Sequence, residues 1–435
     1  MSQEPKISLI SAILININIM LGAGIFINTT ELARLAGALS GFTYILIGIL
    51  MLPLITSIAR LTTLCPAGGF YSFGKAGISE FAGFMAAWSY FIGKLASGAL
   101  MMHLSLSLLQ QLVPLLQVVP ILYLDCGAIL LFVLLNMLNM KAGSTIQAFF
   151  TVLKLIPIFF AIAVCLFLFD GGNFITSNFI VSGIPATLPL LLYASMGFEA
   201  ACLLSSKMEN PKKNGPRAIF ISYVIALSIA ALYQMLFYGA LGNVLQGLSG
   251  YLELFPTLLN LLFQESLVLA VKLKTILHIA IACSALGGSY GIMFSNTWNL
   301  HTLAQNNHIF FPKLFLSLNK YKIPVFCVLF EGLLYGLYLL ITGGYQIPLQ
   351  QLSALGVVFA YTISIISLLR ISLQSKKDSF YKFVSLLALI NCSCLIIACV
   401  QGLIKNGLIY FAIFATLLTL GSIMFFVMDR QKKLT

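Results

Sequence analysis

Long apolar runs constrain the fold of this chain more than any other feature. A window of about 19 residues finds twelve runs, each long enough to cross a hydrocarbon core roughly 30 Å thick. Only 8% of the residues are charged and 60% are hydrophobic, whereas about 25% of a soluble domain is charged. We therefore predict an all-α, multi-pass integral membrane protein. The predicted spans are 8–28, 38–58, 80–108, 119–140, 146–169, 184–206, 217–241, 272–300, 323–342, 349–370, 382–402 and 407–428.

Positive charge is distributed unevenly between the predicted loops. If both termini are cytoplasmic, most lysines and arginines fall in the inner loops and tails. The outer side then retains Arg34 and Lys405, with Lys272 and Lys274 at a helix end. This asymmetry follows the positive-inside rule and supports both the span count and the orientation. The formal charge of +12 is therefore expected to face the cytoplasm and the anionic lipid of the bilayer, so no nucleic-acid partner is expected.

The nine cysteines lie mostly inside apolar runs, without the spacing of metal ligands or of a secreted disulfide framework. We interpret them as small core residues and expect no metal site and no cofactor. The N-terminal stretch MSQEPKISLISAIL leads into the first apolar run without a small-residue cleavage site, which predicts a retained anchor.

Two predicted spans are interrupted near their middles. The first contains Gly22 and Gly24 in NINIMLGAGIF, although each glycine costs about 1 kcal/mol of helix propensity relative to alanine. The sixth contains Gly197 and Glu199 in YASMGFEAA. If spans one to five and six to ten are two repeats, each interruption lies in the first helix of a repeat. This is the pattern of an inverted-repeat transporter with a midplane site. The alternative is glycines that let membrane helices pack closely.

An interruption at this depth frees backbone groups that a ligand can bind. Amides at the start of the second half-helix lie at the positive end of the helix dipole and suit a carboxylate. Carbonyls at the ends of the first half-helices can accept from an ammonium group. They lie around Ile19 and Met20 and around Tyr193 and Met196. Irregular backbone inside a bilayer is tolerated where it lines a cavity or is buried in protein, so the sequence predicts a site for a zwitterion.

Five strings resemble the amino acid-polyamine-organocation (APC) superfamily in their order and spacing. They are GAGIF, PAGGFYSFG at 66–74, TVLKLIP at 151–157, GFEAACLLSSKMENPKKNGPRAI at 197–219 and AQNNHIFFPKL at 304–314. Within it the chain is most similar to bacterial amino-acid permeases and to the arginine/agmatine exchanger group. The resemblance implies a single transmembrane domain in a bacterial cytoplasmic (inner) membrane. Its LeuT-like fold would have two inverted repeats of five helices, about 8–170 and 184–372, and two peripheral helices at about 382–428.

The resemblance also implies the residues of a substrate site. The substrate carboxylate is expected on amides next to Gly22, namely those of Ala23, Gly24 and Ile25. The substrate ammonium is expected on the carbonyls of Ile19, Met20, Tyr193 and Met196. Met293 is expected as a pocket residue, although SYGIMFSNTWNLHTL departs from the family pattern at Asn296 and Trp298.

Three ionisable residues lie deep inside predicted spans, namely Lys154, Lys94 and Glu199. Charge is costly at this depth and is usually functional. Lys154 matches a position where proton-coupled members of the superfamily carry a lysine in place of a bound sodium ion. We predict that Lys154 couples transport to protons; the alternative is a static structural charge. Lys94 aligns with a side-chain recognition position, where it would repel cationic substrates or pair with Glu199. Alternatively, it faces lipid and extends its ammonium to the interface.

Glu199 and three isolated ionisable residues within the predicted spans are expected to have gating or structural roles. Glu199 is predicted to be a gating or structural carboxylate. His103, His278 and Glu331 are isolated in the sequence and are predicted to be hydrogen-bonded packing residues.

The function predicted from these features is secondary active transport of amino acids or close amine analogues by alternating access. Proton-coupled uptake is our first choice, and amino acid/amine exchange is the alternative. A channel remains a third candidate, because broken helices also line pores. An enzyme is not expected, because the chain has no H-E-x-x-H string and only 12 acidic residues and 4 histidines.

Overall fold

The computed structural model describes residues 6–22, 24–66, 69–175, 179–263, 267–375 and 378–434. Within these residues the chain forms helices and no named strand. Three isolated bridges join extended segments, between Ile7 and Met208, Gly37 and Phe179, and Leu318 and Pro324.

Ten α-helices, several of them short, lie among the described residues of the first half of the chain. They are α1 (Leu9–Met20), α2 (Gly24–Ile27), α3 (Thr29–Ala36), α4 (Ser40–Leu64), α5 (Gly69–Gly77), α6 (Glu80–Leu112), α7 (Pro114–Gln117), α8 (Ile121–Asn136), α9 (Met140–Phe167) and α10 (Gly172–Ile175).

In the second half, the residues that the structure describes form eleven α-helices and three short 3-10 helices. They are η1 (Val181–Gly183), α11 (Ile184–Ser195), α12 (Ala200–Leu203), η2 (Ser205–Lys207), α13 (Pro211–Leu241), α14 (Val244–Gly247), η3 (Tyr251–Glu253), α15 (Leu254–Leu262), α16 (Leu267–Gln305), α17 (Pro312–Phe315), α18 (Val325–Thr342), α19 (Gln346–Leu373), α20 (Ser379–Asn406) and α21 (Leu408–Leu434).

Among the described residues, ten helical segments are long and apolar enough to cross a membrane. Two of the twelve predicted spans coincide with shorter helices. The span at 119–140 is represented by α8, which has 16 residues, and that at 184–206 by α11, which has 12. Pro120 precedes α8 and fixes where that helix begins, and the second helix is shortened by the interruption at Met196 to Glu199.

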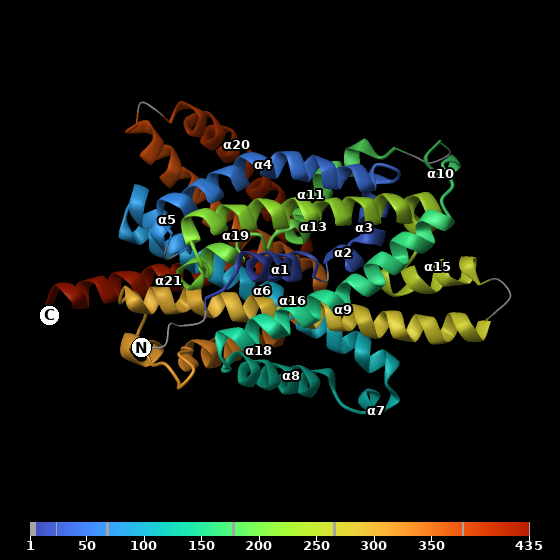
Figure 1. The fold of residues 1–435 in the computed structure, drawn as a ribbon, viewed down its shortest axis with the longest axis horizontal. Coiled ribbons are helices and arrows are strands. Elements are labelled where there is room, and N and C mark those ends of the chain that lie inside the picture. Colours follow the sequence, from blue (N-terminus) through green and yellow to red (C-terminus); the bar gives the residue numbers. More distant parts are fainter. Residues whose placement is uncertain are drawn as a thin grey trace.

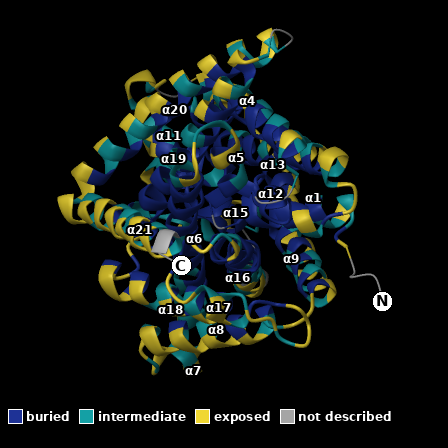
Figure 2. Ribbon diagram, turned by 90° about the vertical axis from the view of Figure 1, so that its left-hand side faces the viewer, coloured by how far each residue is buried: buried dark blue, intermediate teal, exposed yellow. Residues whose placement is uncertain are grey.

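The helices form a bundle whose interior is built from α1, α6 and α16. Most helices run along the long axis of the molecule (Figure 1), and burial is concentrated around this central group while the outer faces of α8, α20 and α21 are exposed (Figure 2). Large apolar side chains such as Leu130, Phe159 and Ile397 are more than half exposed on the outside. An apolar exterior around a packed interior is what a bilayer requires of a multi-pass protein.

Both ends of the chain lie at one end of the long axis (Figure 1), which we call the termini end; the other is the distal end. Beside the start of α1, the amide of Ile7 donates to the carbonyl of Lys207 at 2.8 Å. In α21, the ammonium of Lys432 donates to the carbonyl of Asn306 and lies 3.4 Å from Nδ1 of His308. The terminal helices are thus tied to the loops of the bundle.

His308 connects α21 to α5. Its Nε2 lies 2.8 Å from the hydroxyl of Tyr71. Because the Lys432 ammonium can only donate, Nδ1 of His308 accepts and Nε2 carries the proton. Burial, followed by the positive charge of Lys432, lowers the pKa of His308 to about 4. The neutral imidazole is therefore the form that fits this contact.

Candidate functional site

Both predicted interruptions coincide with helix ends. Helix α1 ends at Met20 and α2 begins at Gly24, while Ala23 lies outside the described residues. Helix α11 ends at Ser195, and Met196 adopts an extended conformation with φ −77° and ψ 150°. Gly197 follows at φ +127°, a backbone conformation that favours glycine. At both interruptions the backbone therefore leaves the helical conformation for a few residues before a short helix begins.

The two interruptions contact each other in the centre of the bundle. A Cβ atom at Gly197 would lie 2.8 Å from Cγ2 of Ile19 and 2.9 Å from the amide nitrogen of Met20. A Cβ atom at Gly24 would lie 3.2 Å from the Cα of Ala194. These glycines permit close backbone approach, as the packing alternative requires. They also bring two sets of helix ends together, as the binding hypothesis requires.

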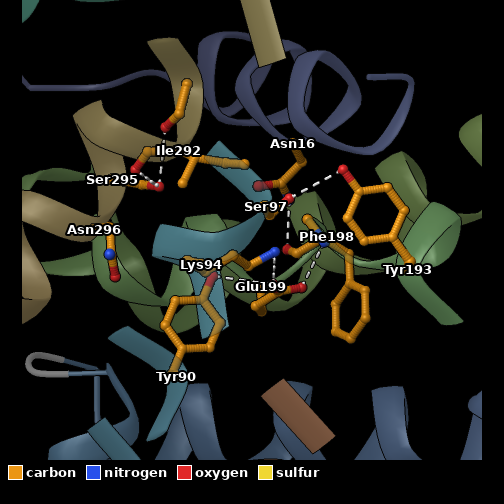
Figure 3. Close-up of polar contacts among 12 residues, drawn as sticks. Asn16, Tyr90, Lys94, Ser97, Tyr193, Phe198, Glu199, Ile292, Ser295 and Asn296 are labelled. Carbon is orange, nitrogen blue, oxygen red and sulfur yellow. Dashed lines mark hydrogen bonds and ion pairs between the residues drawn. The ribbon is translucent and has the colours of Figure 1, made fainter. Parts of the chain in front are cut away.

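Two asparagines that sequence reasoning passed over hold this arrangement. Asn16 donates to the carbonyl of Phe198 at 2.7 Å and accepts from the amide of Ala201 at 3.0 Å, so it joins α1 to the second interruption (Figure 3). Asn18 donates to the carbonyl of Gly287 on α16 at 2.8 Å and to the side chain of Gln147 on α9. The sequence signal that could have identified them is the presence of two polar asparagine side chains in the otherwise apolar stretch NINIM.

Lys154 lies on α9 with its side chain fully buried against α1. Its ammonium donates to the carbonyl of Asn18, which belongs to the last turn of α1. The last carbonyls of a helix have no partner within that helix, so a cation placed there gains both a hydrogen bond and a favourable dipole interaction. Lys154 therefore connects α9 to the first interruption.

Lys94 and Glu199 form a buried ion pair at the second interruption. The Lys94 ammonium lies 2.8 Å from Oε1 of Glu199, and the two side chains are 3% and 0% exposed. The hydroxyl of Tyr90 also donates to Oε1 at 3.0 Å, and the amide of Gly197 donates to Oε2 at 2.8 Å (Figure 3). Lys94 thus pairs with Glu199, one of the three predicted arrangements, and its side chain is buried in the bundle. The pair fixes α6 to the turn between α11 and α12.

Met101 on α6 fills space beside the first interruption. A Cβ atom at Gly22 would lie 2.5 Å from its Cε, and one at Gly288 on α16 would lie 2.6 Å from its Sδ. Tyr193 lies close by, and Ser97 donates to its hydroxyl at 3.4 Å (Figure 3). The thioether side chain of Met101 therefore lies next to the predicted site for the substrate carboxylate.

Two other predicted site residues are buried. Ile25 is in the first turn of α2. Met293 is on α16, two positions after Gly291, and residues two apart point to different sides of a helix. Gly291 packs against Ile19, since a Cβ atom there would lie 2.8 Å from Cγ1 of that residue. Met293 is therefore directed away from the contact between Gly291 and α1.

A cavity of about 550 Å³, which we call the distal cavity, opens toward the distal end. Its lining includes Ile27, Asn28, Arg34, Leu190, Tyr251 and Tyr345. Asn28 donates to the carbonyl of Leu190 at 3.1 Å and accepts from the side chain of Gln350 at 3.0 Å. The distal cavity therefore reaches the end of α2 at Ile27, and Asn28 in its lining is hydrogen-bonded to α11 and α19.

The chemistry available at this site is polar recognition. Helix-end backbone, two asparagines, a buried lysine and a compensated ion pair surround the interruptions. In the part of the chain that the structure describes, no group of three His, Cys, Asp or Glu side chains is placed to hold a metal ion.

Comparison with known proteins identifies relatives of this chain. A protein-family model described as "Amino acid permease" matches residues 7–426. An arginine/ornithine antiporter of Latilactobacillus sakei is 27% identical over 256 residues, covering 54% of this chain and 53% of the relative. One of Pseudomonas aeruginosa is 25% identical, covering 55% and 52%. A serine/threonine exchanger of Bacillus subtilis is 29% identical, covering 52% and 53%. In these matches the chain spans about half the length of the curated relatives.

Proposed function

We propose a transport function from one premise, namely that the chain belongs to the amino acid permease family of the APC superfamily. The protein is a secondary active transporter that carries amino acids or close amine analogues by alternating access. The observation that carries this proposal is the contact between the two helix interruptions, at which buried Lys154 bonds to the carbonyl of Asn18. Unwound backbone held in protein at this depth suits a zwitterion.

The proposed membrane arrangement has twelve spans. Two inverted repeats of five helices, about 8–170 and 184–372, are followed by peripheral helices at about 382–428. Both termini face the cytoplasm of a bacterium, so the distal cavity opens outward. The common position of the two chain ends supports an even number of spans (Figure 1), and the charge asymmetry between the predicted loops supports the orientation.

In the proposed complex, the substrate uses backbone groups at both interruptions. Its carboxylate accepts from the amides of Gly24 and Ile25, together with that of Ala23. Its ammonium donates to the carbonyls of Ile19, Met20, Tyr193 and Met196. The contacts of Gly197 with Ile19 and Met20 support this assignment, because they place the ends of α1 and α11 together.

For coupling, we propose that Lys154 binds and releases a proton during the transport cycle. Burial disfavours an isolated charge, while the carbonyl of Asn18 stabilises the ammonium. A change in the end of α1 would alter this balance, because the bond to Asn18 ties Lys154 to that helix. Amino acid exchange is the second candidate, supported by the names of the relatives, which are antiporters and an exchanger.

Uptake by purified protein in liposomes tests this proposal. We expect uptake of an amino acid that needs no sodium and is stimulated by an inward proton gradient. Proton stimulation should be lost in Lys154→Ala and kept in Lys141→Ala, which removes an exposed lysine from the same helix. A sodium requirement, or undiminished proton stimulation in Lys154→Ala, would reject the coupling role. If no amino acid or amine enters, with or without substrate loaded inside, the transport proposal fails.

A further inference from the structure

A histidine hydrogen-bonded to a buried carboxyl group lies outside the proposed substrate site. Nδ1 of His103 on α6 lies 2.8 Å from Oδ2 of Asp125 on α8. The His103 side chain is 18% exposed and that of Asp125 is 2% exposed. Sequence reasoning treated His103 as isolated, because a partner 22 residues away on another helix gives no local signal. The pair has no part in the transport mechanism proposed above.

The pair adjoins a wall of the distal cavity. His103 follows Lys94 by nine residues, which is about 13 Å along α6 toward the distal end. Its Nε2 packs on the turn between α18 and α19, where a Cβ atom at Gly344 would lie 2.3 Å away. Gly343 and Gly344 have φ of +61° and +73°, so this tight turn depends on glycine. The next residue, Tyr345, lines the distal cavity.

The charge of the pair depends on one proton. With that proton, the pair is neutral overall, either as carboxylate and imidazolium or as carboxylic acid and imidazole. Without it, Asp125 carries an uncompensated negative charge. Within the described residues its Oδ1 has no hydrogen-bond partner, and a buried unpaired charge is strongly unfavourable. The presence of one proton therefore decides whether this buried pair is neutral overall or carries an unpaired negative charge.

The neighbouring helices offer little compensation. The other ionisable side chains on their distal halves are Tyr123 and Cys126 on α8, Tyr335 and Tyr338 on α18, and Lys272, Lys274, His278 and Cys283 on α16. The two lysines are the groups in this set that carry charge at neutral pH, and neither pairs with Asp125. Further along these helices, Lys94 is paired with Glu199, and Glu331 is a carboxylate.

We propose that His103 and Asp125 form a proton-binding site, separate from Lys154, that controls how the Gly343–Gly344 turn packs on α6. The protonated pair holds the turn against the imidazole. The deprotonated pair needs water or new donors, so the turn moves off His103 and the wall of the distal cavity loosens. The site therefore responds to pH on the distal side, which is the outer side in the proposed orientation.

Hydrogen exchange of the protein in lipid nanodiscs tests this inference without any transport assay. After correction for intrinsic exchange, protection of amides 343–347 should be at least about threefold lower at pH 8 than at pH 6. In Asp125→Asn, protection should be high and independent of pH. The double variant Asp125→Asn with His103→Gln should behave likewise, since two amides retain a hydrogen bond and do not titrate.

The matched control is His301→Gln, which removes a histidine bonded to the carbonyl of Phe315 on the termini side. It should keep the wild-type pH profile at 343–347. A wild-type profile without pH dependence overturns the inference, as does a pH dependence that survives in both Asp125 variants. Transport activity does not enter either result, so the outcome is separate from that of the uptake experiment.

Discussion

The buried pair of Lys94 and Glu199 makes a quantitative prediction about stability. Removing one partner of a buried ion pair costs about 3–5 kcal/mol, because the other charge is left uncompensated. In Lys94→Met, Glu199 keeps its bonds from Tyr90 and Gly197, so we expect the lower end, about 3 kcal/mol. In the double variant Lys94→Met with Glu199→Gln, both charges are gone and the amide oxygen still accepts. The double variant should therefore lose about 1 kcal/mol of unfolding free energy relative to the wild type.

The assay is a double-mutant cycle on purified protein in detergent. Glu199→Gln leaves the Lys94 ammonium uncompensated and should also cost about 3 kcal/mol. We therefore expect a coupling free energy of about 5 kcal/mol between the two positions. For 435 residues the unfolding entropy is roughly 0.9 kcal/mol per kelvin, so Lys94→Met should lower the Tm by roughly 3 °C. The exposed pair of Lys75 and Glu80, 2.6 Å apart, is the control. Its coupling should be below about 1 kcal/mol.

The reasoning is refuted if the effects of Lys94→Met and Glu199→Gln are additive within about 0.5 kcal/mol. Additivity would mean that the two groups do not form a pair inside the folded protein. A control pair with the same coupling as the buried pair would refute the role assigned to burial.

Three further predictions follow from the same contacts. Gly24→Leu should abolish substrate binding while the protein still inserts, because the Cβ position is already 3.2 Å from Ala194; normal binding by this variant in a ligand-dependent melting assay would place the site elsewhere. Lys94→Asn should shift substrate preference toward cationic amino acids, because it leaves the Glu199 carboxylate unpaired; competition uptake with acidic, neutral and basic amino acids measures this, and an unchanged ranking contradicts it. His308 has a pKa of about 4 in the protein and about 6.5 when unfolded, so its contribution is present above pH 6.5 and lost as pH falls toward 4. Acidification from pH 7 to pH 5 should cost at most roughly 2 kcal/mol, less with solvent screening, and His308→Gln should be less sensitive in pH-dependent melting curves.

The sequence predicted the helical class and the position of both interruptions, because apolar length and glycine placement are local signals. It set the eighth span at 272–300, whereas α16 covers Leu267–Gln305. Residues 301–305, HTLAQ, are mostly polar and fall outside an apolar window, whereas 267–271, LVLAV, are apolar and precede the lysines at 272 and 274. It placed the sixth span at 184–206 with a break at Gly197 and Glu199, and α11 and α12 lie on either side of that break.

The contacts that hold the site were harder to predict. Asn16 and Phe198 are 182 residues apart, and Asn18 and Gly287 are 269 apart. A single sequence shows that an asparagine in an apolar helix needs a partner, but the partner depends on how the helices pack. Pairing of Lys94 with Glu199 was predicted as one alternative, since both are charged residues in membrane spans. The partner of His103 was not considered, because Asp125 lies near the end of its predicted span.

The methionine beside Gly22 has a consequence for affinity. A ligand that enters there must displace Met101 from Gly22 and Gly288, so its binding free energy is the difference between two sets of contacts. An unbranched thioether can rotate aside for cargo of several shapes, which leaves discrimination to the rigid backbone around it. In the proposed transport cycle, the same side chain would return to Gly22 and Gly288 after release. The loaded and empty states of that cycle would then differ little in packing, which would favour rapid turnover over tight binding.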